Sequence, residues 1–247
     1  MAQVGHRLGA HGLPMSRHQA LTQLQNYRPQ LRADERTRET LHLIENYPCA
    51  PLDRPLVTLI VRAALQMLPD WALDLLPPKT TSAVLDLGTG SGAVALAIAH
   101  ACPQAQVSAS DVSADALAVA QANALRLGLP VQFALGAWLQ PWAGQRFGLI
   151  VSNPPYVAEP DPHWPGLRHE PRLALAAGPD GLDALRWLVA HAADHLNPGG
   201  WLLLEHGHDQ ADAVQTLLRS HGWQPVQSRL DEAGIRRCTG AGTPGVK

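Results

Sequence analysis

The stretch that most constrains the fold of this chain runs from Val84 to Asn123. Its first residues, 84–87, are an apolar run typical of a buried strand, and the glycines within residues 88–92 interrupt that run. Small and apolar residues then continue to His100, which predicts a helix directly behind the turn. A strand, a glycine turn and a helix in this order indicate the start of a nucleotide-binding α/β sheet.

A second signal is a carboxylate at the end of the next expected strand, residues 107–110. Asp111 follows this strand, about 20 residues after the glycine turn, where such folds hydrogen-bond ribose hydroxyls. Because glycine has no Cβ, a ligand can lie directly against the turn. Position 93 is Ala, so the spacing differs from the Gly-x-Gly-x-x-Gly fingerprint of dinucleotide sites. We therefore expect a cofactor that has no pyrophosphate, and S-adenosylmethionine is the candidate. The alternative is that the glycine turn binds no ligand and only connects the strand to the helix.

Composition narrows the class of protein. The chain has 247 residues, enough for one sizeable α/β domain and a small appendage. With 19 basic and 21 acidic residues the net charge is −2, so we expect no stable nucleic-acid binding. The 3 cysteines form no paired motif, which predicts a reduced, cytoplasmic setting. No apolar run approaches the roughly 18 residues of a membrane span, and the first residues do not resemble a secretory signal.

The chain divides by pattern into two parts. Residues 1–55 carry scattered His and Arg and only a partial helical period, which predicts a short helical N-terminal arm. Residues 56–247 form the α/β domain, and an amphipathic period over residues 56–68 predicts a helix at the edge of its sheet. The alternation of elements predicts a parallel sheet with helices on both faces. We expect strands at 84–87, 107–110, 131–134, 148–152, 200–205, 224–229 and 235–239. We expect helices at 92–101, 113–127, 180–195 and 209–221.

A second group of chemically suggestive residues, Asn153-Pro154-Pro155-Tyr156, directly follows an apolar strand. Open α/β sheets bind their ligands at the carboxyl ends of strands. The prolines fix the backbone, so the Pro154 carbonyl oxygen lies beside the Asn153 side-chain oxygen as a rigid acceptor. Two such acceptors suit a planar NH₂ group, whose face Tyr156 would cover. An ordinary turn is the alternative, since Asn before Pro often starts one.

These acceptors also suit a particular reaction. Transfer of a methyl group from a sulfonium places positive charge on the nitrogen, so fixed carbonyl dipoles bind the transition state better than the neutral amide. The pattern therefore predicts catalysis by positioning, without an obvious strong base.

With these motifs together, the chain resembles the HemK-type glutamine N5-methyltransferases of peptide chain release factors, whose near relatives modify a ribosomal protein. The likeness spans residues 84–240, and the segment of residues 170–182 is more discriminating than the two general methyltransferase motifs. It is carried by DLGTGSG (86–92), SNPPY (152–156), EPRLALAAGPDGL (170–182), PGGWLLLE (198–205) and residues 231–240. The resemblance implies a Rossmann-like seven-stranded class I methyltransferase domain and S-adenosylmethionine-dependent N5-methylation of a glutamine in a translation protein, with a release factor as the expected partner.

The resemblance also implies roles for individual residues. The cofactor-binding residues would be Asp86, Gly88, Thr89, Gly90, Gly92, Asp111, Trp138 and Asn153. The catalytic residues would be Asn153, Pro154 and Tyr156, and the substrate amide would lie against Asn153, Pro154, Pro155 and Tyr156. Asp86 would orient the methionine amino group through the loop, and Trp138 would either stack on adenine or pack in the core. Glu170, Pro171 and Arg172 would shape the substrate mouth, or form a solvated charge pair.

Two departures from the family pattern bear on activity. Ala137 precedes Trp138 where the family has an acidic residue that accepts from the adenine amino group, so we expect weaker adenine recognition. Residues 54–56 retain only part of a Pro-Arg-Pro motif, and the short N-terminal arm predicts weaker docking of the protein substrate.

Three alternatives stay open. One is an N-methyltransferase acting on an exocyclic amine of DNA or RNA, because Asn-Pro-Pro-Tyr also suits a base flipped from its stack. Another is a catalytically impaired relative that only binds the cofactor. His206 and His208, beside Glu205, suggest a metal site, but no third ligand has a matching spacing, so we expect none.

Overall fold

The computed structural model describes most of the second part of the chain and little of the first. The described residues are 7–8, 14–15, 67–77, 79, 81–159, 172–231 and 234–244. The chain divides into two compact units, Met1–Gln66 and Met67–Lys247. In the first unit, β1 (Arg7–Leu8) pairs antiparallel with β2 (Pro14–Met15). The predicted boundary at residue 55 lies outside the described residues, as does nearly all of the helix expected at 56–68.

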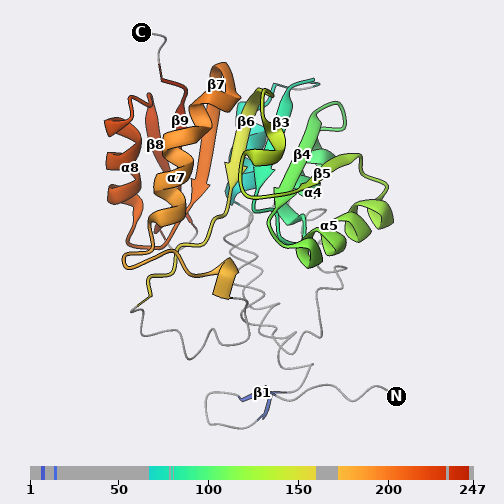
Figure 1. Ribbon diagram of the computed structural model, residues 1–247, viewed down its shortest axis with the longest axis horizontal. Coiled ribbons are helices and arrows are strands. Elements are labelled where there is room, and N and C mark those ends of the chain that lie inside the picture. The colour runs from blue at the N-terminus through green and yellow to red at the C-terminus, as the bar shows by residue number, and fades with distance from the viewer. Residues whose placement is uncertain are drawn as a thin grey trace. The chain divides into compact units, whose positions relative to one another are not determined.

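The second unit is built on a seven-stranded sheet with the order β5-β4-β3-β6-β7-β9-β8 (Figure 1). The strands are β3 (Ala83–Leu87), β4 (Gln106–Asp111), β5 (Val131–Leu135), β6 (Phe147–Ser152), β7 (Leu196–Glu205), β8 (Val226–Leu230) and β9 (Arg236–Gly242). Every predicted strand is present within a few residues.

The prediction of a parallel sheet is wrong at one edge. β9 runs antiparallel to both β7 and β8, whereas the other neighbouring strands are parallel. Only residues 231–235 connect β8 to β9. A parallel crossover needs a dozen or more residues, so this short connection forces a hairpin.

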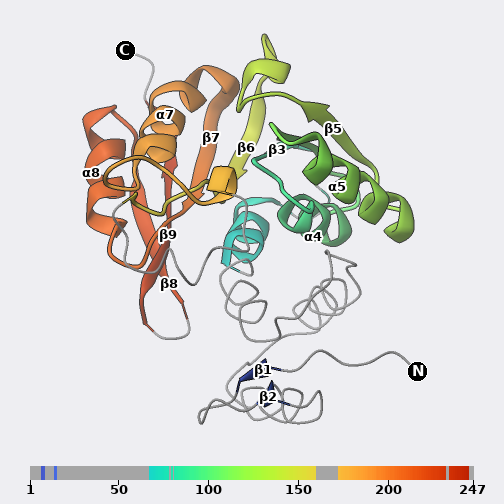
Figure 2. The same ribbon diagram turned by 60° about the horizontal axis from the view of Figure 1, so that its bottom comes forward.

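Helices cover both faces of the sheet, as the alternation predicts. They are α4 (Ala93–Ala101), α5 (Ala114–Leu127), α7 (Asp183–His191) and α8 (Ala211–Ser220). Residues 67–75 are also helical, and no helix was expected over residues 69–75. Figures 1 and 2 show α7 and α8 on one face of the sheet, and α4, α5 and the helix of residues 67–75 on the other. No helix in the described part of the chain has the length and apolar character needed to cross a bilayer.

The core explains why the strands read as continuous apolar runs. Leu85 and Leu204 point toward α7 and α8, where they pack with Leu188 and Val214 in one buried cluster. Intervening residues of the same strands point to the opposite face, which helices also cover. A sheet buried on both faces therefore leaves polar groups mainly at the strand ends.

The fold brings the two predicted motifs to the same edge of the sheet. β3 and β6 are neighbours, and Leu87 is the register partner of Ser152. The Ser152 hydroxyl also donates to the Leu87 carbonyl oxygen, at 2.7 Å. The glycine turn follows Leu87 and the Asn-Pro-Pro-Tyr segment follows Ser152, so both begin from adjacent positions. This is also where the strand order reverses, the usual place for a ligand in an open α/β sheet.

Candidate active site

The glycine turn is held against β4 by its own backbone. The amides of Gly88 and Thr89 both donate to the Ser110 carbonyl oxygen, at 2.9 and 3.0 Å. Gly88, Gly90 and Gly92 have φ of +70°, +57° and +87°, in the left-handed region where a side chain is strained. Apart from its chain neighbours, no atom of the described residues lies within 4 Å of the position a Cβ would take on Gly90. The turn is therefore rigid and has an open side where a ligand can approach.

Asp86 supports this turn from inside the protein. Its side chain is 1% exposed, and Oδ2 accepts hydrogen bonds from the Thr89 hydroxyl at 2.6 Å and the Ala95 amide at 3.1 Å. Burial raises the pKa of Asp86 to about 6, the two hydrogen bonds oppose this shift, and the charge of Asp111 adds to it. Asp86 thus connects the turn to the start of α4, and the Thr89 hydroxyl is engaged in the same contact.

Asp111 lies at the end of β4 and faces the turn. Its Oδ2 accepts from the Gly90 amide at 2.8 Å, and its Oδ1 accepts from the Ser113 amide at 2.9 Å. A carboxylate has about four acceptor sites, so each oxygen keeps capacity for another donor. Its partly exposed position therefore suits the predicted contact with ribose hydroxyls.

Trp138 lies beside the same turn with an unusual backbone. Its φ is +47°, and its carbonyl oxygen accepts from the Ser110 hydroxyl at 3.2 Å. Its ring is 3.6 Å from the position a Cβ would take on Gly88, and it stacks on Trp187 with ring centroids 6.1 Å apart. Trp138 is half-buried, so it both packs against the core and forms part of the wall near the turn.

The Asn153–Tyr156 segment turns away from the sheet at the end of β6. Pro154 is buried, whereas Asn153, Pro155 and Tyr156 are partly exposed. The Tyr156 ring packs against the core cluster, and the Arg237 guanidinium carbon lies 5.9 Å from the ring centroid. Burial raises the pKa of the Tyr156 hydroxyl, with a further contribution from Glu205. The hydroxyl therefore remains protonated at neutral pH.

The segment of residues 170–182, which best distinguishes the family, pairs with the chain directly after Tyr156. The Val157 amide donates to the Leu175 carbonyl oxygen at 2.8 Å, and the Ala177 amide donates to the Val157 carbonyl oxygen at 3.0 Å. Arg172 begins a short 3₁₀ helix, Arg172–Ala174, whereas Glu170 and Pro171 lie outside the described residues. The described part of the segment therefore supports Asn-Pro-Pro-Tyr through backbone pairing.

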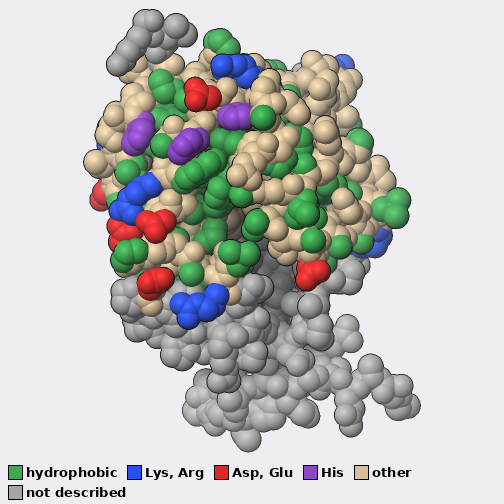
Figure 3. All heavy atoms as spheres, in the orientation of Figure 1, with side chains coloured by type: hydrophobic (Ala, Val, Ile, Leu, Met, Phe, Trp, Pro, Cys, Tyr) green, Lys and Arg blue, Asp and Glu red, His purple; other side chains and the backbone are tan. Residues whose placement is uncertain are grey.

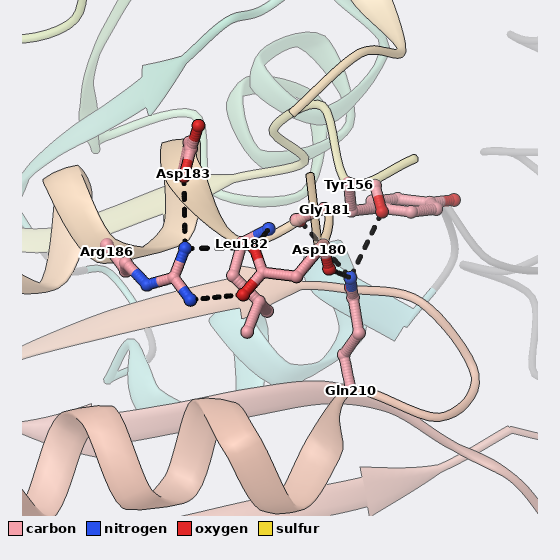
Figure 4. Close-up of polar contacts among 7 residues, drawn as sticks. All are labelled: Tyr156, Asp180, Gly181, Leu182, Asp183, Arg186 and Gln210. Carbon is pink, nitrogen blue, oxygen red and sulfur yellow. Dashed lines mark hydrogen bonds and ion pairs between the residues drawn. The ribbon is translucent and has the colours of Figure 1, made fainter. Parts of the chain in front are cut away.

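Gln210, at the start of α8, joins three loops, a role that no pattern in the sequence indicated. Figure 4 shows its side-chain amide between Tyr156 and the Asp180–Gly181 turn. Nε2 donates to the carbonyl oxygens of Tyr156 and Gly181, at 3.1 and 3.2 Å, and Oε1 accepts from the Gly207 amide at 2.8 Å. Asp180 in turn pairs with Arg186 on α7. This group of contacts fixes the backbone next to the proposed substrate contacts.

Glu205 is a further residue that sequence reasoning did not assign to the site. It is 1% exposed at the end of β7, and burial raises its pKa to about 7, which the charge of Arg237 partly opposes. Among the described residues, none donates to its Oε2 atom. An acidic residue that ends a buried apolar strand was the available signal, because the same pattern identified Asp111.

The histidines beside Glu205 do not converge on a common point. His206 is fully buried, and its ring nitrogens lie 2.9 Å from the Gly207 carbonyl oxygen and 2.8 Å from the Thr239 hydroxyl. The His208 side chain is 70% exposed. Within the described ranges, no three His, Cys, Asp or Glu side chains are grouped as a metal site would require.

Comparison with known proteins identifies the family. A model described as the methyltransferase small domain matches residues 70–163. A second, for the catalytic domain of ER-bound oxygenase mpaB/B'/Rubber oxygenase, matches residues 1–97, and each covers less than half of the chain. The release factor glutamine methyltransferase of Xylella fastidiosa strain Temecula1 is 52% identical over 191 residues, which are 76% of this chain and 70% of that protein. The chain belongs to the release factor glutamine methyltransferase family.

Other relatives agree with this assignment. The family member from Coxiella burnetii is 44% identical over 180 residues, covering 72% of this chain and 65% of its own length. The matches thus span about two thirds of these relatives. A solved methyltransferase structure from Pyrococcus furiosus aligns with a TM-score of 0.54 over 71% of this chain and 83% of its own, at 21% identity. The predicted family and the Rossmann-like fold class are both confirmed.

Proposed function

We propose that this chain transfers the methyl group of S-adenosylmethionine to the N5 nitrogen of a glutamine side chain in a peptide chain release factor. Family membership supports the reaction and its cofactor. The observation that carries the proposal is the register of Leu87 with Ser152, which starts the glycine turn and the Asn-Pro-Pro-Tyr segment from adjacent positions. One small site at this edge can therefore hold a nucleoside and an amide together.

The cofactor would lie against the glycine turn. Gly90 presents open space where its Cβ would be, and Asp111 offers partly exposed acceptors for the ribose. The Trp138 ring provides an apolar surface for adenine, but Ala137 offers no side-chain acceptor for the adenine amino group. When bound, S-adenosylmethionine supplies an electrophilic methyl group on a sulfonium.

The amide would lie against the next motif. The Asn153 side-chain oxygen and the Pro154 carbonyl oxygen each accept one hydrogen of the NH₂ group, which fixes the direction of the nitrogen. As the nitrogen gains positive charge, both oxygens interact more strongly with its hydrogens, so the transition state is favoured over the ground state. The hydrogen bond from the Gln210 side chain to the Tyr156 carbonyl oxygen and the backbone pairing of Val157 hold the chain that directly follows these acceptors.

The charge distribution favours a protein acceptor over nucleic acid. The net charge is −2, and on the face drawn in Figure 3 the acidic and basic side chains are interspersed. A surface that neutralises phosphates carries clustered Lys and Arg. Methylation of an exocyclic base amine is therefore the less favoured function, and the experiment below includes it as an outcome.

The test is to incubate the purified chain with methyl-labelled S-adenosylmethionine and a release factor, a ribosomal protein or bulk RNA and DNA. We expect label in the release factor, on a glutamine located by peptide mass spectrometry. Asn153→Ala should lower kcat about 100-fold, because it removes one of the two fixed dipoles, while the Kd for S-adenosylmethionine changes little.

The matched control is Asn197→Ala, at the opposite end of the sheet at the start of β7 and exposed. It should retain wild-type transfer. Label in nucleic acid would show that the methyl acceptor is a base amine and not a protein. Absence of label from every acceptor, with the cofactor still bound, would indicate a relative that binds the cofactor without catalysis. An equal loss of cofactor binding and transfer in Asn153→Ala would contradict the assigned role of Asn153.

A further inference from the structure

Glu205 lies in the same row of the sheet as the proposed substrate contacts. Leu204 is the register partner of Ser152, so Glu205 and Asn153 are the next residues on neighbouring strands. Neighbouring strands lie about 4.8 Å apart, and register partners point to the same face. The carboxylate therefore extends from a position adjacent to Asn153, at the edge where both motifs end.

Residues of β9 and of the segment after β6 lie around this carboxylate. Cys238 on β9 is its register partner and is also fully buried. Arg237, next on β9, supplies the nearby positive charge, and Tyr156 from the segment after β6 is close enough for its pKa to respond to Glu205. On the covering helix of residues 67–75, Asp74 already pairs with Arg229, at 2.6 Å.

One oxygen of this buried acid lacks a hydrogen-bond donor among the residues that the structure describes. Glu205 is 1% exposed, and none of the described residues donates to Oε2. An unsatisfied buried polar atom in a native fold calls for a ligand or a chemical role, because burying it without a partner costs its hydration. The amide of a bound glutamine can supply the missing donor.

We propose that Glu205 Oε2 accepts the proton that the glutamine nitrogen loses during methyl transfer. This inference rests on the proposed function, and it adds a base that the sequence did not indicate. Asn153 and Pro154 orient the NH₂ group, and Glu205 removes one of its hydrogens.

The atoms and charges balance. The nitrogen forms a bond to the methyl carbon, the carbon–sulfur bond breaks, and its electron pair stays on sulfur as a neutral thioether. One N–H bond breaks, and its proton passes to the Glu205 carboxylate, which becomes a neutral acid. A sulfonium and a carboxylate are thus both neutralised in a site of low dielectric, where separated charges are costly. The acid then returns its proton to water before the next turnover.

The first test compares wild type with Glu205→Gln, which keeps the size of the side chain and removes the base. We expect kcat to fall about 100-fold, the typical contribution of a positioned general base, with little change in Kd for S-adenosylmethionine and release factor. Wild-type kcat should rise with pH through about 7, the pKa of Glu205, and level off above it, whereas the residual rate of Glu205→Gln should lack this step. Glu205→Asp should restore part of the rate and the pH step.

The control variant is Asp212→Asn, an exposed acid at the start of α8 that is paired with Arg236. It should keep both the wild-type rate and the wild-type pH profile. A pH-independent wild-type kcat between pH 5.5 and 8.5 would overturn the proposal without any variant. So would a Glu205→Gln variant with wild-type kcat. A wild type that transfers no methyl group would overturn the proposed function as well, and the two failures are therefore distinguishable.

Discussion

At the scale of single residues, Gly181 shows how backbone space controls the site. Its φ is +74°, and a Cβ would collide with the Tyr156 carbonyl oxygen and lie 2.7 Å from Gln210 Nε2. Both atoms belong to the contacts that fix the Asn-Pro-Pro-Tyr segment. Gly181, the second glycine of the discriminating GPDG sequence, is thus required by close packing against the proposed substrate loop.

Gly181→Ala should lower both stability and transfer. The left-handed backbone and the collision together should reduce the free energy of unfolding by about 2 kcal/mol or more. Methyl transfer should fall because Tyr156 is displaced. Gly144→Ala is the control, with a φ of +76° but, in the described part of the chain and apart from its sequence neighbours, no atom within 4 Å of its Cβ position. It should lose about 1 kcal/mol from backbone strain alone and keep its activity. Urea titration and initial rates measure both effects, and equal behaviour of the two variants would refute the close-packing explanation.

At the scale of elements, the start of α8 connects to the end of β6 through one side chain. The Gln210 side-chain amide donates to the carbonyl oxygens of Tyr156 and Gly181 in two other loops and accepts from the Gly207 amide in its own loop. α8 itself is held by Val214 and Leu218, which are buried against the sheet. The loop carrying Tyr156 is therefore positioned by a helix that packs independently of it.

Gln210→Ala should separate positioning from cofactor binding. Loss of its hydrogen bonds should cost about 2 kcal/mol of stability and lower kcat/KM for the protein substrate, because the acceptors near Tyr156 are less fixed. The Kd for S-adenosylmethionine should change little, since the glycine turn has separate supports. The control is Gln215→Ala on the same helix, which loses two hydrogen bonds away from the loop, one to Ser228 at 2.7 Å and one from Arg219 at 2.9 Å. Equal kcat/KM in the two variants would argue against a positioning role for Gln210.

At the scale of the whole molecule, the fold keeps two acids buried at the strand ends. Burial raises the pKa of Asp86 from 3.8 to about 6 and that of Glu205 from 4.5 to about 7. A group with a raised pKa in the folded state stabilises the fold fully below its unfolded value, and this contribution is lost as the pH rises through the folded value. Buried His206 opposes this trend at low pH, because burial lowers its pKa. Because three buried groups titrate, the contribution of one acid is obtained from the difference in the free energy of unfolding between a variant and the wild type.

The free energy of unfolding of Glu205→Gln, minus that of wild type, should increase as the pH rises from 4.5 to about 7 and then stay constant. Chemical denaturation across this range measures the difference without any substrate. Asp212→Asn should show no such rise between pH 5 and 7, because the pKa of Asp212 is lowered by Arg236. A difference that is flat across the whole range would contradict a raised pKa for Glu205.

The sequence determined the elements and the two motifs, because both depend on local chemistry. Apolar runs ending in Gly88 and Asn153 located the strand ends, and glycine and proline limit the backbone near them whatever surrounds them. Asp111 was predicted at the turn because the order of strand, turn and acid fixes its place. The family resemblance added the role of the segment at residues 170–182, and backbone pairing now explains the described part of that segment.

The tertiary structure alone decided the direction of β9, the partners of Gln210 and the surroundings of Glu205. Each depends on residues far apart in the chain: β9 inserts between β7 and β8, and Gln210 reaches Tyr156 across the fold. The sequence pattern around an acid at a strand end is the same whether its side chain is exposed to water or buried by neighbouring elements. Burial, which raises the pKa of Glu205, exists only once the neighbouring strands and helices have assembled.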